Sequence, residues 1–162
     1  MKKNIYLAFS IILFAFTSSC SGYKPIFNTS SIQFEIKDYS ISGDERLGDL
    51  IYQNLKNIAG KNNQDAQSVT LSINVLKKKN PTVKDSTGKI LEYKINIMTN
   101  LIMNDFYNDE ELLKHDFNYS SSFEVQDQHS ETIKLENINI QNLINKTHQN
   151  IIIKISENLN KR

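Results

Sequence analysis

The chain has 162 residues, with 19 lysines and arginines against 18 aspartates and glutamates, and a formal net charge of +1. This length suits one ordinary domain, and the balanced charge argues against a general nucleic-acid-binding protein. Cys20 is the only cysteine. No disulfide can form within the chain, so its stability must come from packing.

The N-terminal residues have the three parts of a secretory leader. A positive start, Met1–Asn4, precedes an apolar run, Ile5–Phe16, and the small residues Thr17–Ser19 stand directly before Cys20. As a helix the apolar run would span about 18 Å, well short of the roughly 30 Å core of a bilayer. Residues 1–19 are therefore predicted to be a lipoprotein signal peptide, with Cys20 as the lipidated residue. A free thiol or an intermolecular disulfide are the alternatives for this odd cysteine.

The residues after Cys20 indicate where the protein resides. Acyl chains on the cysteine would hold the protein at a membrane. Ser21 stands where an aspartate commonly signals inner-membrane retention, so we expect an outer-membrane protein, lipid-anchored on the periplasmic side. Residues 20–31 contain turn and loop formers and are predicted to be a lipidated tether. Residues 32–162 are predicted to form a single α+β domain.

The first part of the domain predicts a strand followed by a helix. Apolar and polar residues alternate over about Ile32–Ile41, which is typical of a half-buried strand. Ser42 lies three residues before Glu45, the spacing of a capping box, and predicts the start of a helix. Apolar residues then recur at three- and four-residue spacing as far as Ala59, and Gly60 is a plausible C-cap.

Alternation returns in three later segments and predicts three more strands. Their ranges are Val69–Val75, Leu91–Met103 and Leu112–Phe123. The polar stretch Lys77–Lys89 is predicted to turn the chain between the first two, and Asn104–Glu111 between the last two.

A second helix is predicted from Glu131 onward. Residues of one face recur there at intervals of three and four: Ile140, Ile144, His148, Ile151, Ile155 and Leu159. The run Ile151–Ile155 is locally β-prone. The whole pattern predicts an α+β fold with a mostly antiparallel four-stranded sheet packed with two helices, in the order β-α-β-β-β-α.

Residues that carry catalytic or metal chemistry are sparse. His115, His129 and His148 are scattered without a close second ligand, so no metal site is expected. The sequence has no glycine-rich phosphate loop and no nucleophile elbow. We therefore expect a protein that is not an enzyme and carries no cofactor.

Five lysines gather around the first predicted hairpin: Lys77, Lys78, Lys79, Lys84 and Lys89. Together they could meet the phosphates of an anionic glycolipid. The alternative is that they form only a solvated hairpin end.

Two segments resemble a known family. Cys20-Ser21-Gly22-Tyr23-Lys24-Pro25-Ile26-Phe27 looks like the segment that follows the lipidated cysteine in the LPS-assembly lipoprotein LptE family, especially its alphaproteobacterial branch, with Ser21 inserted. Asp85-Ser86-Thr87-Gly88-Lys89-Ile90-Leu91-Glu92-Tyr93 is similar to the family's approach into a long strand. The order of strands and helices also agrees.

The resemblance implies a partner and a function. It implies a lipoprotein that sits in the lumen of the outer-membrane β-barrel LptD, assists its assembly and helps to deliver lipopolysaccharide, without covalent catalysis. The five lysines are then candidate lipopolysaccharide contacts. The competing hypothesis is an outer-membrane lipoprotein with a structural or envelope-tethering role and no glycolipid handling.

Overall fold

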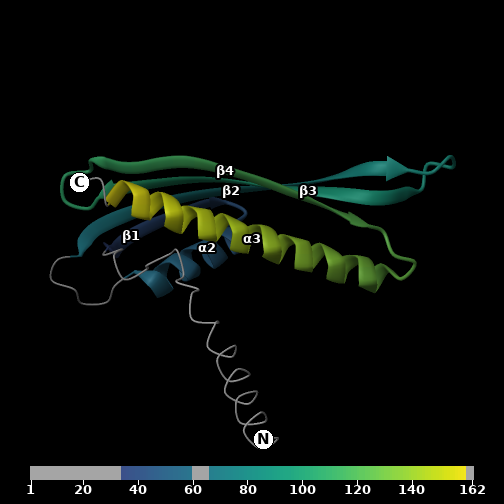
Figure 1. Ribbon diagram of the computed structural model, residues 1–162, viewed down its shortest axis with the longest axis horizontal. Coiled ribbons are helices and arrows are strands. Elements are labelled where there is room, and N and C mark those ends of the chain that lie inside the picture. The colour runs from purple at the N-terminus through teal and green to yellow at the C-terminus, as the bar shows by residue number, and fades with distance from the viewer. Residues whose placement is uncertain (1–33, 60–65, 160–162) are drawn as a thin grey trace, which may run out of the picture.

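The computed structural model describes residues 34–59 and 66–159. The elements follow in the order β1 (Phe34–Gly43), α2 (Glu45–Ile58), β2 (Gln67–Lys84), β3 (Ile90–Asp105), β4 (Glu111–Glu124) and α3 (His129–Leu159) (Figure 1). This is the predicted order, and the α+β class is confirmed. Residues 1–33, which include the predicted signal peptide and tether, lie outside the described residues.

The four strands form one sheet in the order β1-β2-β3-β4. β2 with β3 and β3 with β4 pair antiparallel, as predicted, whereas β1 pairs parallel with β2. The sheet is therefore mixed. A parallel pair of neighbouring strands needs a crossover connection, and α2 supplies it by returning the chain to the end where β1 starts.

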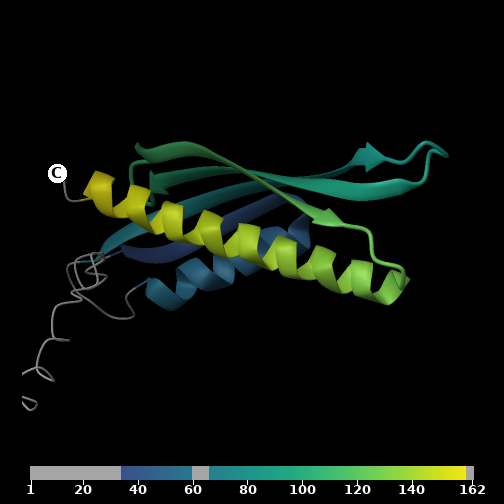
Figure 2. The same cartoon turned by 45° about the vertical axis from the view of Figure 1, so that its right-hand side comes forward.

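Both helices cover the same face of the sheet (Figures 1 and 2). Side chains alternate between the two faces of a strand, and in β2 and β3 the odd-numbered residues are those buried beneath the helices. The main buried apolar side chains from the strands are Val69, Leu71, Ile73, Val75, Ile95, Ile97, Leu101, Met103 and Phe117, and those from the helices are Leu47, Ile51, Leu55, Ile140, Ile144, Ile151 and Ile155. This continuous core fixes which face of each element looks outward.

The N-terminus of α2 lies two residues later than the capping box predicts. Ser42 is still part of β1, where it pairs with Asn74, so it cannot cap the helix. Asp44 is the N-cap instead, and its carboxylate accepts a hydrogen bond from the backbone N–H of Leu47 at 3.2 Å. Ala59 is the C-cap residue, and the predicted C-cap, Gly60, lies outside the described residues.

The first hairpin differs from the prediction in its length. β2 continues to Lys84 and pairs with β3 along that length, so the turn is confined to the residues between Lys84 and Ile90. The prediction of a polar turn over Lys77–Lys89 is wrong for its first eight residues. From Leu76 onward every residue of β2 is exposed, so the sequence shows no buried alternation there, yet backbone pairing with β3 maintains the strand.

α3 is one continuous helix of 31 residues. At 1.5 Å rise per residue it is about 46 Å long, and it runs beneath the sheet over most of the sheet's length (Figure 2). The β-prone run Ile151–Ile155 is helical because Ile151 and Ile155, four residues apart, both reach the core. Tertiary packing here outweighs local propensity.

Candidate functional site

Cys20 has no structural description, since it lies outside the described residues. The chain enters the described part at Phe34, the first residue of β1, which is buried in the core. The lipidation site therefore rests on the sequence pattern around Cys20.

The five predicted lysines lie along the first hairpin without converging on one point. Lys77, Lys78, Lys79 and Lys84 belong to β2, and Lys89 lies just before β3. Because side chains alternate along a strand, Lys77 and Lys79 lie on the helix side of the sheet and Lys78 on the other side. The structure thus divides the group between two faces and the hairpin end.

The two lysines on the helix side each meet a carboxylate. Lys77 Nζ lies 3.7 Å from an oxygen of Asp44, the N-cap residue of α2. Lys79 forms an ion pair with Glu136 of α3. These two charges connect β2 to the two helices, so part of the predicted group has a structural role.

Lys79 also lies against aromatic rings. Its Nζ is 4.3 Å from the ring centroid of Tyr93 and 5.6 Å from that of Phe123. Tyr93 and Phe123 are cross-strand partners on β3 and β4, and their rings stack with centroids 6.0 Å apart. The ammonium group is thus held by both a carboxylate and two ring faces.

The turn at the hairpin end is organised by Asp85. One oxygen of its carboxylate accepts hydrogen bonds from the Thr87 hydroxyl at 2.7 Å, the Thr87 N–H at 2.8 Å and the Lys89 N–H at 2.9 Å. The hydrogen bond from the Thr87 hydroxyl is the main cause that lowers the pKa of Asp85. Gly88 completes the turn with a positive φ of 87°. The turn holds Lys89 by its backbone and leaves its side chain exposed.

A cavity of about 410 Å³ lies between the hairpin and the start of α3. Lys79 and Lys89 line it from the hairpin, Tyr93 from β3, and His129 and Glu136 from α3. Of these residues, the sequence predicts only the lysines as ligand contacts, since no spacing in the chain connects Tyr93 with residues about forty positions later.

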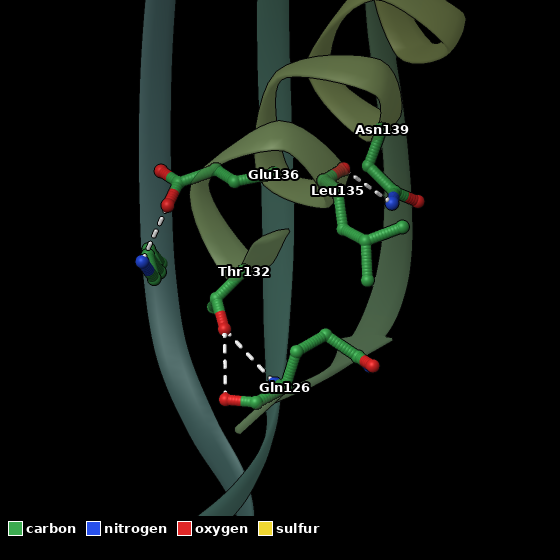
Figure 3. A network of polar contacts seen from close by, with 6 residues as sticks. Gln126, Thr132, Leu135, Glu136 and Asn139 are labelled. Atoms are coloured by element: carbon green, nitrogen blue, oxygen red, sulfur yellow. Dashed lines mark hydrogen bonds and ion pairs between the residues drawn. The ribbon is translucent and has the colours of Figure 1, made fainter. Parts of the chain in front are cut away.

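Polar contacts fix the wall of this cavity where β4 leads into α3 (Figure 3). The hydroxyl of Thr132 accepts a hydrogen bond from the N–H of Gln126 at 2.9 Å and donates to the Gln126 carbonyl at 3.4 Å. On the next turn of α3, Asn139 donates from Nδ2 to the Leu135 carbonyl at 2.8 Å. The bonds of Thr132 hold the loop against the first turn of α3, whereas that of Asn139 lies within the helix.

The opposite face of the sheet carries no helix among the described residues and is largely polar. A second cavity, of about 370 Å³, lies there among Asn74, Leu76, Met98, Asn100 and Asn118. Leu76, Met98 and Phe117 give this cavity a largely apolar lining, and three asparagines and Asp116 supply its polar groups. This face thus presents both polar and apolar side chains, and it can contact either water or a partner protein.

The described residues contain no group of three or more histidine, cysteine, aspartate or glutamate side chains placed to hold a metal ion. Within the same residues, neither helix combines the length and apolar character needed to cross a membrane. What the described part offers is a basic hairpin, a cavity beside it and an open polar sheet face.

A mixed four-stranded sheet with two helices on one face is the fold of a set of solved bacterial lipoproteins. Lipoprotein B from Nitrosomonas europaea superposes with a TM-score of 0.57 at 12% identity, over 83% of this chain and 90% of that one. A protein assigned as a lipoprotein from Caulobacter crescentus gives 0.55 at 15% identity, over 76% and 90%. A minor lipoprotein from Acinetobacter baumannii gives 0.53 at 15% identity, over 77% and 94%.

At these identities the likeness shows a common fold. No protein-family model and no curated protein sequence matches the chain.

Proposed function

We propose that the protein is an outer-membrane lipoprotein, anchored through Cys20, that partners the LptD β-barrel in assembling lipopolysaccharide at the outer membrane. The observation that carries the proposal is a fold shared with bacterial lipoproteins in a chain that has a lipoprotein-type leader and cysteine at its start. The resemblance of the segment from Cys20 to Phe27 to the LptE family supports the choice of partner.

The physical character of the domain suits a place inside a barrel. The interior of an outer-membrane barrel is polar, and the open face of this sheet presents amide side chains such as Asn74, Asn100 and Asn118. Lipid chains at Cys20 would confine the domain to the membrane surface and raise its effective concentration near the barrel. No covalent chemistry is needed for this role.

The anchor is tested by metabolic labelling with palmitate. We expect label on the wild-type chain and none on Cys20→Ala. Label on neither chain, or equal label on both, would contradict an acylated Cys20.

The partnership is tested by purification from detergent-solubilised membranes. We expect the tagged wild-type chain to bring down a large β-barrel in stoichiometric amount. Recovery of the intact lipoprotein without a barrel would favour the structural or envelope-tethering role.

Direct contact with lipopolysaccharide is proposed for the hairpin lysines. Their ion pairs divide them into two groups that can be tested separately. Lys78, Lys84 and Lys89 have no side-chain ion pair among the described residues, whereas Lys77 and Lys79 each have one. Replacing the three unpaired lysines by glutamine should weaken binding of purified lipopolysaccharide at least tenfold, since each charge near an anionic surface contributes about 1 kcal/mol.

The matched control is the double variant Lys77→Gln, Lys79→Gln, which removes the two lysines already paired with carboxylates. We expect a smaller effect on lipopolysaccharide binding from this variant than from the triple variant. Unchanged binding in the triple variant would contradict the lysine contact and leave the barrel partnership to its own test.

A further inference from the structure

β2 extends well beyond its neighbour β1. The last register pair between them is Gly43 with Val75, while β2 continues to Lys84 with β3 on its other side. Among the described residues, the edge of β2 from Leu76 to Lys84 therefore has no strand beside it. The hairpin of β2 and β3 projects past the end of β1 (Figures 1 and 2).

One contact shows which residues point their backbone hydrogen-bonding groups toward this free edge. The Val75 carbonyl accepts a hydrogen bond from the Asp44 N–H at 2.7 Å, so the backbone groups of Val75 face the β1 side. Because these groups alternate in direction along a strand, those of Lys77 and Lys79 face the same side. Each offers one N–H and one carbonyl at the open edge.

Pro81 fits this pattern and limits the edge. Pro81 is odd-numbered, like Lys77 and Lys79, so its backbone groups also face the open edge. Proline has no N–H, and at this position that costs no hydrogen bond to β3. A shift in register follows directly between Pro81 and Val83 and changes the alternation. The regular open edge thus runs from Leu76 to Pro81, about 20 Å at 3.3 Å per residue.

The charge of the hairpin indicates which kind of segment can bind at this edge. The hairpin from Leu76 to Lys94 contains six lysines and two acidic residues, Asp85 and Glu92, in a chain whose net charge is only +1. The outer edge of the sheet at β4 differs, since that strand has three acidic residues and one lysine. An acidic extended segment would therefore favour the edge of β2 over that of β4.

Apolar side chains accompany the charges. Leu76 and Val83 on β2 are 49% and 44% exposed, and Leu91 on β3 is 41% exposed. Lysines and a proline on an edge strand oppose pairing with an identical edge. The same lysines attract a strand of opposite charge, so a second copy of this edge is disfavoured as the occupant.

We propose that the free edge of β2, from Leu76 to Pro81, binds an extended acidic segment of another protein by strand addition. Backbone hydrogen bonds to Lys77 and Lys79 supply the pairing, and the hairpin lysines select for negative charge. This interaction surface does not depend on the handling of lipopolysaccharide.

The pairing is tested with a fluorescein-labelled nine-residue peptide of alternating glutamate and valine, measured by fluorescence anisotropy on the full chain. We expect the peptide to bind, and the same peptide N-methylated at every amide, which blocks both of its edges, to bind at least tenfold more weakly. Equal binding of the two peptides would overturn the proposal, since charge alone would explain it. Absence of binding by the parent peptide would overturn it as well.

Two variants at one position separate the backbone from the side chain. Lys77→Ala and Lys77→Pro both lose the contact with Asp44, but only Lys77→Pro loses the outward N–H. We expect Lys77→Pro to bind the peptide at least fivefold more weakly than Lys77→Ala, with equal thermal unfolding midpoints. Equal affinities would overturn the proposal, and the N-methylated peptide decides the question if Lys77→Pro fails to fold.

Two further measurements on the Lys77 variants, of lipopolysaccharide binding and of self-association, test other occupants of this edge. Purified lipopolysaccharide should bind Lys77→Pro and Lys77→Ala equally, and a loss specific to Lys77→Pro would overturn the assignment of that edge to peptide. Dimers of the wild-type chain that dissociate in Lys77→Pro would also overturn the proposal, because the edge would then belong to a second copy.

Discussion

Gly43 permits the close approach between the end of β1 and β2. Its φ is 81°, a conformation that residues with a Cβ rarely adopt, and a Cβ built there would lie 2.1 Å from the carbonyl oxygen of Val75. Gly88 has a similar φ of 87° but nothing within 4 Å of its Cβ position. A side chain at Gly88 would therefore meet backbone strain alone, whereas one at Gly43 would meet both strain and a steric clash.

We expect Gly88→Ala to lower the free energy of unfolding by about 1 kcal/mol, the cost of the left-handed conformation alone. Gly43→Ala should cost about 3 kcal/mol, since backbone must also move. Urea denaturation of both variants measures the difference. Equal losses of stability would mean that the Val75 backbone moves away from the new Cβ without cost.

His148 lies on α3, half-buried, and burial lowers its pKa from the ordinary 6.5, while a backbone hydrogen bond with Asn54 of α2 opposes the shift. Since the unfolded chain binds the proton more readily, this histidine's contribution to stability is present above pH 6.5 and is lost as the pH falls toward the lowered value.

We expect His148→Asn to flatten the decline in the free energy of unfolding between pH 7.5 and pH 5. Equal slopes for the wild type and His148→Asn would contradict the role of burial.

At the scale of elements, the start of α3 is held by one buried hydroxyl. Thr132 is 6% exposed and bonds both the N–H and the carbonyl of Gln126. Thr147 is fully buried on the same helix, but its hydroxyl donates to the Leu143 carbonyl, four residues back. A carbonyl inside a helix already has a backbone partner, so only the loss of Thr132 removes the protein partner of backbone groups in the loop.

Thr132→Val should therefore lower the free energy of unfolding by about 2 kcal/mol, and Thr147→Val by less than about 1 kcal/mol. Chemical denaturation measures both changes. A loss from Thr147→Val as large as that from Thr132→Val would show that hydroxyl burial, not the loop contact, decides the cost.

The elements also show what the sequence could predict. Strands with one buried face can be predicted because burial produces alternation, as in Val69–Val75. The outer half of β2 cannot be predicted in this way, because its residues are exposed and show no apolar periodicity. The parallel pairing of β1 depends on where α2 docks. The contact between Lys79 and Glu136 joins positions 57 residues apart, and no local pattern encodes it.

At the scale of the whole molecule, the buried apolar side chains of the described residues lie between Phe34 and Ile155. The predicted anchor at Cys20 is outside that range. The domain should thus owe its stability to its own core and its location to the lipid.

We expect Cys20→Ala to move the protein from the membrane fraction to the soluble periplasmic fraction, with a free energy of unfolding of the processed domain within about 0.5 kcal/mol of the unmodified wild-type domain. Cell fractionation and urea denaturation measure the two effects. A large loss of stability would show that the N-terminal segment belongs to the fold, and retention of the processed chain in the membrane would show a second attachment.

The parallel register of β1 and β2 has a mechanical consequence. The two strands run in the same direction, so Phe34 and the hairpin end at Lys84 lie toward opposite ends of the sheet. A membrane that pulls on the N-terminal side of β1, against a partner that grips the hairpin, would load the pair along the strand axis. The hydrogen bonds between the strands would then share the force in shear rather than open one after another. The pair of strands would thus resist tension in the direction in which the proposed lipid anchor would apply it.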